Sequence, residues 1–153
     1  MPLETLFFIF IALLVGAGYP VQAGVNATIA GAHGHPLLAA LTNTTVASLV
    51  LLAAVLFLRV PAPQIAALAA APWWAWTGGC LGAFFVLSSL VLAPKLGAAA
   101  FVSTTIVGTM AASLVIDHFG LIVYRPQPVT ILRLMGAILV VTGMFMITFK
   151  GRG

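Results

Sequence analysis

The segment GAGYPVQAGVN, residues 16–26, lies inside an otherwise almost wholly apolar run that covers residues 3–29. A helix needs about 20 apolar residues to cross a bilayer, and this run is longer. Backbone polar groups in lipid must be hydrogen-bonded within the chain, so the run is predicted to be helical. The segment therefore places a proline, a tyrosine and two amides inside a membrane-spanning helix.

The composition of the whole chain indicates an integral membrane protein. Of its 153 residues, 63% are hydrophobic and only 5% are charged, whereas soluble domains carry about 25% charged residues. The net charge of +4 comes from six Lys and Arg residues that are spread singly. They form no patch of the kind that a nucleic-acid backbone requires, so no nucleic-acid partner is expected. The single cysteine, Cys80, cannot form a disulfide within the chain.

Five apolar runs are long enough to span the membrane, and the fold is predicted to be all-α, with residues 1–153 forming a single five-helix membrane domain. The predicted spans are residues 3–29, 37–58, 73–92, 96–122 and 129–149. The first span is not expected to be a cleaved signal peptide, because no Lys or Arg precedes it and Glu4 has the wrong sign. The connections are too short for a soluble domain, which places the function in the membrane or at its edges.

The cations divide equally between the two ends of the predicted bundle. Arg59, Arg125 and Arg133 fall on one side, and Lys95, Lys150 and Arg152 fall on the other. The positive-inside rule therefore favours neither orientation. A weak bias overridden by the hydrophobicity of the first span is one interpretation. We favour dual topology, in which two copies insert in opposite directions and pair as an antiparallel homodimer with inverted symmetry, an arrangement typical of secondary transporters.

Small residues at helical spacing predict close contacts between helices. Small side chains let membrane helices approach closely. The spacing alone does not say whether these contacts lie within one chain or between two chains. The glycines expected to pack are Gly78 and Gly82 in the third span, Gly108 in the fourth, and Gly136 and Gly143 in the fifth.

The polar residues of the opening segment share one helical face. Tyr19, Gln22 and Asn26 are three and four residues apart, so they line the same side. An amide that faced lipid would cost several kcal/mol, so this face is expected to meet protein, water or a substrate. Pro20 removes a backbone donor, and with Gly18 beside it we expect a kink that permits gating.

The second span adds Asn43, and for all three amides a binding role and a role in joining helices both remain open. Most Ser and Thr hydroxyls in the spans are expected to bond their own helix backbone. No acid lies near the centre of a span, which favours a cargo of low charge. Asp117 and His118 are candidates for proton coupling, or they end the helix near the headgroups with Asp117 paired to Arg125.

Three segments resemble the YdcZ-like family of the drug/metabolite transporter superfamily: GAGYPVQAGVNATI, AAPWWAWTGGCLGAFFVLSSLVLAPKLGAAAFV and ASLVIDHFGL. The resemblance covers nearly the whole chain. It implies a five-span half-transporter in a bacterial inner membrane, working as an antiparallel homodimer, a heterodimer or a fusion, and related to the small multidrug resistance exporters. It also implies that Gln22, Asn26 and Asn43 are the polar site positions.

The sequence departs from these relatives at two points. Thr109 stands where family members often carry glutamine. The essential glutamate in the first helix of the small multidrug exporters has no counterpart, so their proton-for-cation mechanism is not expected.

The sequence thus predicts a transporter subunit, not an enzyme, with no cofactor and no metal. As a dual-topology homodimer in the lipid bilayer it would export a small, low-charge, partly apolar solute by alternating access. Gln22, Asn26 and Asn43 would bind the solute, and Tyr19 would stack on it or gate the site. The alternatives are a small dual-topology channel, which would need a continuous polar path, and an accessory protein that transports nothing, whose amides would be used in helix contacts.

Overall fold

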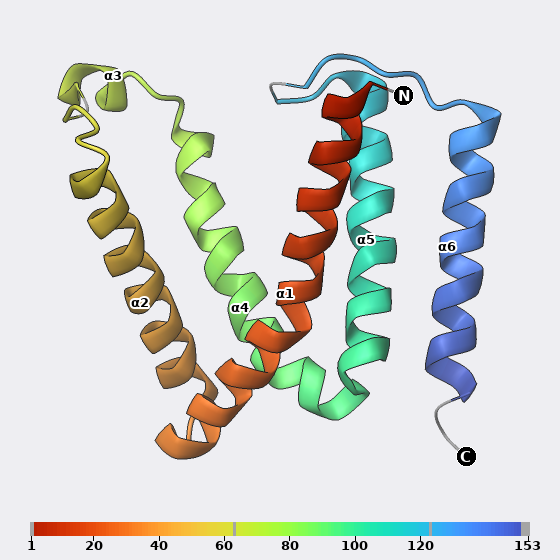
Figure 1. Ribbon diagram of the computed structural model, residues 1–153, viewed down its shortest axis with the longest axis horizontal. Coiled ribbons are helices and arrows are strands. Elements are labelled where there is room, and N and C mark those ends of the chain that lie inside the picture. The colour runs from red at the N-terminus through yellow and green to blue at the C-terminus, as the bar shows by residue number, and fades with distance from the viewer. Residues whose placement is uncertain (1, 63, 123, 151–153) are drawn as a thin grey trace. The chain divides into compact units, whose positions relative to one another are not determined.

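A computed structural model of the protein describes residues 2–62, 64–122 and 124–150, and the described residues form helices and no strands (Figure 1). Five helical segments in this part of the chain are long and apolar enough to cross a membrane, with mean hydropathies of 1.7 to 2.0. Their number confirms the predicted all-α fold with five spans. They are α1 (Leu3–His33), α2 (Pro36–Phe57), the 3₁₀ turn η1 (Trp73–Trp76) continued by α4 (Thr77–Leu96), α5 (Ala98–Phe119) and α6 (Ile131–Lys150). A five-residue helix, α3 (Ile65–Ala69), lies in the link between α2 and η1.

The helix ends differ from the predicted ones where glycine reverses the backbone. The predicted span 96–122 starts at Ala98 and ends at Phe119, although Leu121 and Ile122 are apolar. Gly97 has φ +85° and Gly120 has φ +59°, values that L side chains rarely adopt. Apolar character alone therefore overestimated the length of this span.

Pro20 does not break α1. The helix continues from Leu3 to His33, longer than the predicted 3–29, with Pro20 inside it. Figure 1 shows α1 bending partway along its length, as expected of a helix that lacks one backbone donor. The helix ends where Gly34 adopts the left-handed conformation with φ +71°.

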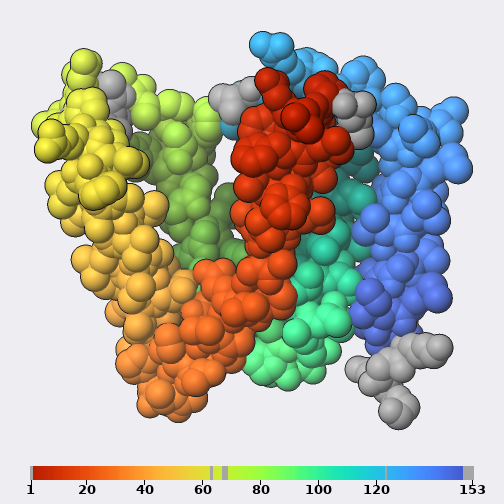
Figure 2. Space-filling model, in the orientation of Figure 1, coloured from red at the N-terminus to blue at the C-terminus, as the bar shows by residue number. Residues whose placement is uncertain are grey.

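The contacts within the chain group it into two compact units, Met1–Pro94 and Lys95–Gly153. In the first unit α1 packs against α2, and in the second α5 packs against α6. The ribbon and space-filling views show α1 and α2 meeting near the turn that joins them and diverging toward their other ends (Figures 1 and 2). Ala23, Asn26 and Ala39, the buried residues of the two helices, lie in the halves nearest that turn.

The glycines predicted to pack between helices have open space beside them. A Cβ built on Gly78, Gly82, Gly108, Gly136 or Gly143 would meet no described atom within 4 Å. The large apolar side chains of α2 and α6 are mostly exposed, as expected of helices that face lipid or another chain. The predicted glycine contacts therefore stay a prediction, and the described residues offer them no partner.

Candidate functional site

The polar residues on one face of α1 differ in their exposure and in their contacts. Asn26 is only 4% exposed, whereas Gln22, one turn earlier, is exposed. Tyr19 is half-buried, and its ring stacks on Phe85 of α4 with the ring centroids 5.4 Å apart and the planes inclined by 29°. Tyr19 thus contacts α4, Asn26 is buried, and Gln22, which lies between them in sequence, is exposed.

The three amides make no hydrogen bonds within the described part of the chain. The side-chain amides of Gln22 and Asn26 neither donate to nor accept from a described residue, and the side chain of Asn43, half-buried on α2, is not bonded to either of them. Each amide therefore offers two donors and an acceptor that a ligand, water or a second chain could use. In a membrane span it costs free energy to leave these groups without hydrogen bonds, because lipid supplies none.

The hydroxyls behave differently from the amides, as predicted from the sequence. Thr44 donates to the carbonyl of Ala40 at 2.9 Å, and the buried Ser89 donates to that of Val86 at 2.7 Å. Thr109 donates to Thr105 at 2.8 Å, so its hydroxyl is occupied within its own helix. The same pattern holds for Thr28, Thr42, Ser48, Ser103, Thr105 and Thr142. These hydroxyls are satisfied locally and leave the amides as the unsatisfied polar groups of the site.

The second unit carries a polar cluster at the link between α5 and α6. Arg133 donates from Nη2 to Oδ2 of Asp117 at 2.9 Å and to Oε1 of Gln127 at 3.2 Å, and from Nη1 to the Gln127 carbonyl at 3.2 Å. The backbone N–H of Gln127 donates to the Asp117 carbonyl at 2.7 Å. His118 accepts at Nδ1 from the Val129 N–H at 3.3 Å. These contacts fasten the link across the end of both helices.

The cluster corrects the predicted partner of Asp117. The sequence suggested Arg125, but the ion pair is with Arg133. Arg133 lies in the first turn of α6, and its side chain reaches the last turn of α5, against which α6 packs. The contacts of Gln127 were not predicted, although a polar residue between two prolines at a helix connection is a reasonable signal for a link contact. A proton-coupling role for Asp117 and His118 stays a prediction.

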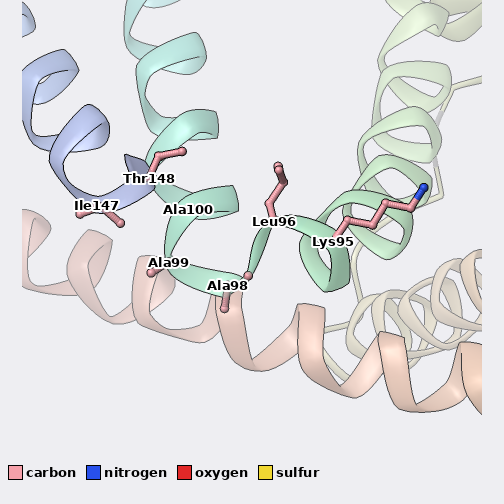
Figure 3. A pocket seen from close by; sticks show the side chains of 8 residues that line it. Lys95, Leu96, Ala98, Ala99, Ala100, Ile147 and Thr148 are labelled. Carbon is pink, nitrogen blue, oxygen red and sulfur yellow. The ribbon is translucent and has the colours of Figure 1, made fainter. Parts of the chain in front are cut away.

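Two pockets of the described residues lie away from the predicted binding side chains. One pocket of about 420 Å³ is formed at the start of α5 and the end of α6, where Figure 3 shows the Lys95 side chain pointing away from Thr148. An apolar pocket of about 290 Å³ lies between α2 and α4 and includes Thr44 and Phe84. Neither is lined by Tyr19, Gln22, Asn26 or Asn43. The described residues also hold no cluster of three or more metal-binding side chains.

Comparison with known proteins gives one result. No curated protein and no solved structure matches the chain. A family model matches residues 7–146, which include the second, third and fourth spans, most of the first and fifth, and the polar face of α1. With its five apolar helices the chain is a multi-pass inner-membrane protein. It belongs to the YdcZ family of the drug/metabolite transporters, described as "Putative inner membrane exporter, YdcZ".

Proposed function

We propose that this chain is one subunit of a secondary transporter that exports a small, low-charge, partly apolar organic solute. Two copies inserted in opposite directions would form an inverted homodimer and work by alternating access. The family's description as an inner-membrane exporter supports the direction and the class. The observation that carries the proposal is the set of three amides, Gln22, Asn26 and Asn43, which lie in spans and make no hydrogen bond with a described residue.

The unused hydrogen-bonding capacity of these amides favours a role in binding a solute over a role in holding the helices of one chain together. Amides that served only to hold helices together would be bonded across a helix contact. Asn26 is 4% exposed and close to the α1–α2 contact, yet its side chain has no hydrogen-bond partner in the described chain. A bound solute would supply the missing partners in a transporter. Partners supplied by the second copy alone would instead fit the accessory-protein alternative.

The chemistry of the site supports a cargo of low charge. The acids of the described residues are Glu4, in the first turn of α1, and Asp117, which is paired with Arg133. Both acids thus lie at helix ends, and no carboxylate of the described residues lies near the centre of a span, where it could neutralise a cationic solute. The amides would hydrogen-bond the polar groups of the solute, and the stacked rings of Tyr19 and Phe85 would contact its apolar part.

The movement would be centred on α1. Pro20 leaves the carbonyl one turn earlier without its usual donor. A Cβ added to Gly18 would meet no described atom within 4 Å, so the helix can bend there without a steric clash. Bending would separate or restore the stack of Tyr19 on Phe85. The ring pair would act as a gate on the solvent path of each copy in an inverted dimer.

The balanced cations and the open glycine faces support the inverted pair. A second copy would give Gly78 and Gly82 of α4, and Gly136 and Gly143 of α6, the helix contacts that the described residues do not provide. The channel alternative would need a continuous polar path, whereas the sequence offers amides at scattered positions, Gln22, Asn26 and Asn43.

The test is transport by purified protein in proteoliposomes. A panel of neutral amphipathic solutes, measured with and without a pH gradient, would identify a cargo whose uptake saturates. Gln22→Ala and Asn26→Ala should then raise KM about three- to tenfold, the effect of losing one hydrogen bond to an uncharged group. Gln64→Ala is the matched control, because this exposed glutamine lies outside the spans. Equal KM values for all three variants would refute the assigned site, and uptake that never saturates would favour a channel.

A further inference from the structure

The turn between α1 and α2 contains two histidines with different hydrogen-bonding roles. α1 ends at His33, Gly34 takes the left-handed conformation, and His35 is the N-cap residue of α2 with φ −151° and ψ 130°. Pro36 then occupies the start of α2, where its missing N–H costs nothing. The turn joins the two helices that carry Asn26 and Asn43.

His35 caps α2 with its ring. Nδ1 accepts from the backbone N–H of Leu37 at 3.2 Å, one of the first-turn donors that have no partner inside a helix. Ser, Thr, Asp and Asn usually fill this role, and all of them accept through oxygen at neutral pH. A histidine can accept through Nδ1 only while that nitrogen carries no proton.

His33 holds the same turn as a donor. The Thr42 hydroxyl has one hydrogen, which it donates to the Leu38 carbonyl at 2.9 Å. With the Thr42 hydrogen directed at the Leu38 carbonyl, the contact between Thr42 Oγ1 and His33 Nε2, at 3.2 Å, is made by the ring N–H donating to the hydroxyl oxygen; the opposite direction belongs to the other tautomer of His33. A second proton on His33 leaves this bond in place, whereas a second proton on His35 removes its acceptor.

We propose that His35 is an acid-sensitive cap, through which protonation loosens the first turn of α2. The ring is exposed, so protons reach it from water. An imidazolium has two donors and no acceptor, and it adds positive charge at the helix end that already carries the positive pole of the dipole. The cap therefore exists only while Nδ1 carries no proton, and acid that protonates this nitrogen removes the hydrogen bond from the Leu37 N–H.

Few other charged groups surround the cap. α1 contributes His33 in its last turn and Glu4 at its opposite end, and α2 carries no charged residue. α4, which contacts α1 through Phe85 and Tyr19, carries Lys95 in its last turn. No carboxylate in these helices lies at the turn to hold an imidazolium in place.

His118 provides a contrast within the same protein. Its Nδ1 also accepts a backbone N–H, from Val129. However, it lies in the last turn of α5, where positive charge is favourable, and Asp117 is adjacent. Arg133 and Gln127 also hold that link by contacts that do not involve the imidazole. Acid should therefore act on the α1–α2 turn more strongly than on the α5–α6 link.

The consequence for transport rests on the proposed function. In an inverted pair the α1–α2 turns of the two copies would face opposite compartments. A pH difference across the membrane would then loosen the turn of one copy only, next to the helices that hold its amides. The cap would thereby give the transporter a direction without a carboxylate near the centre of a span.

The test uses hydrogen exchange of the Leu37 amide in the full-length protein in lipid nanodiscs, resolved by mass spectrometry with fragmentation. Protection factors, corrected for intrinsic exchange, are compared at about pH 8 and about pH 5. In the wild type the factor should fall about fivefold on acidification, the usual worth of one N-cap. His35→Asn keeps an acceptor at both pH values and should stay protected. His33→Gln keeps a donor to Thr42 and should respond like the wild type.

Two results would overturn the proposal: a wild-type protection factor that does not change with pH, or a His35→Asn variant that loses protection as the wild type does. His35→Ala should be unprotected at both pH values, and if it fails to fold, the His35→Asn comparison decides alone. Because hydrogen exchange requires no transport, a failure here leaves the proposed function standing. Failure of the transport test likewise leaves the cap standing.

Discussion

Gly120 is the position where a single added methyl group should cost the most. The residue ends α5 with φ +59°, a conformation that an L residue adopts at a cost of about 1–2 kcal/mol. A Cβ there would also lie 2.6 Å from Cγ of Pro126, 3.0 Å from its Cδ and 3.2 Å from its backbone N. A proline ring cannot rotate away as a flexible side chain would, so the link between α5 and α6 must shift.

The expected cost of Gly120→Ala is the sum of these two effects. Overpacking of this kind costs about 1–3 kcal/mol, which with the backbone strain gives about 2–5 kcal/mol. Gly34→Ala is the matched control: Gly34 has φ +71° but no described atom within 4 Å of its Cβ position, so only the strain of about 1–2 kcal/mol should appear.

The assay is reversible unfolding in mixed detergent micelles, followed by the helical circular dichroism signal. It is applied to Gly120→Ala, Gly34→Ala, Pro126→Ala and the double variant Gly120→Ala/Pro126→Ala. Removing the ring should reduce the cost of Gly120→Ala to that of Gly34→Ala, a coupling of about 1–3 kcal/mol. If Gly120→Ala costs no more than Gly34→Ala, or if the double variant shows no coupling, the close contact with Pro126 does not constrain the link and the reasoning fails.

Two further predictions concern charge and assembly. Asp117→Asn should destabilise the protein by about 1 kcal/mol, because its partner Arg133 is 34% exposed and such pairs are weak. The difference in stability from wild type should shrink in high salt. A transport defect with unchanged thermal stability would indicate proton coupling instead. Gly82→Leu and Gly143→Leu should leave the helical content unchanged, since the Cβ positions of both glycines are open. Both variants should lower the dimer fraction, measured by energy transfer between labelled copies, and raise the dissociation constant of the dimer about tenfold or more. A dimer fraction equal to that of wild type would show that these faces do not meet a second copy.

The sequence was sufficient to predict features that depend on composition or on neighbours along one helix. Five spans follow from the lengths of the apolar runs. The hydroxyl bonds of residues such as Thr44 and Thr109 follow from the distance between a side chain and the carbonyl one turn earlier. The polar face of Tyr19, Gln22 and Asn26 follows from the spacing of a helix, which Pro20 does not interrupt.

The features that depend on packing could not be predicted. Asp117 pairs with Arg133, sixteen residues away, rather than with the nearer Arg125, because α6 packs on α5 and turns its first residues toward the end of α5. The stack of Tyr19 on Phe85 depends on which face of α4 meets α1. Nothing in the periodicity of either helix specifies that choice.

The most direct test of an inverted transporter is the orientation of the chain in its membrane. Single cysteines at Ala32, in the last turn of α1, and at Pro128, in the link before α6, are placed in a Cys80→Ser background and labelled from each side of the membrane with an impermeant reagent. Three spans separate the two positions, so they report opposite faces of the same molecule. The account predicts that each cysteine is labelled in comparable amounts from both sides. Labelling of Ala32→Cys from one side only, with Pro128→Cys labelled only from the other, would contradict the antiparallel homodimer.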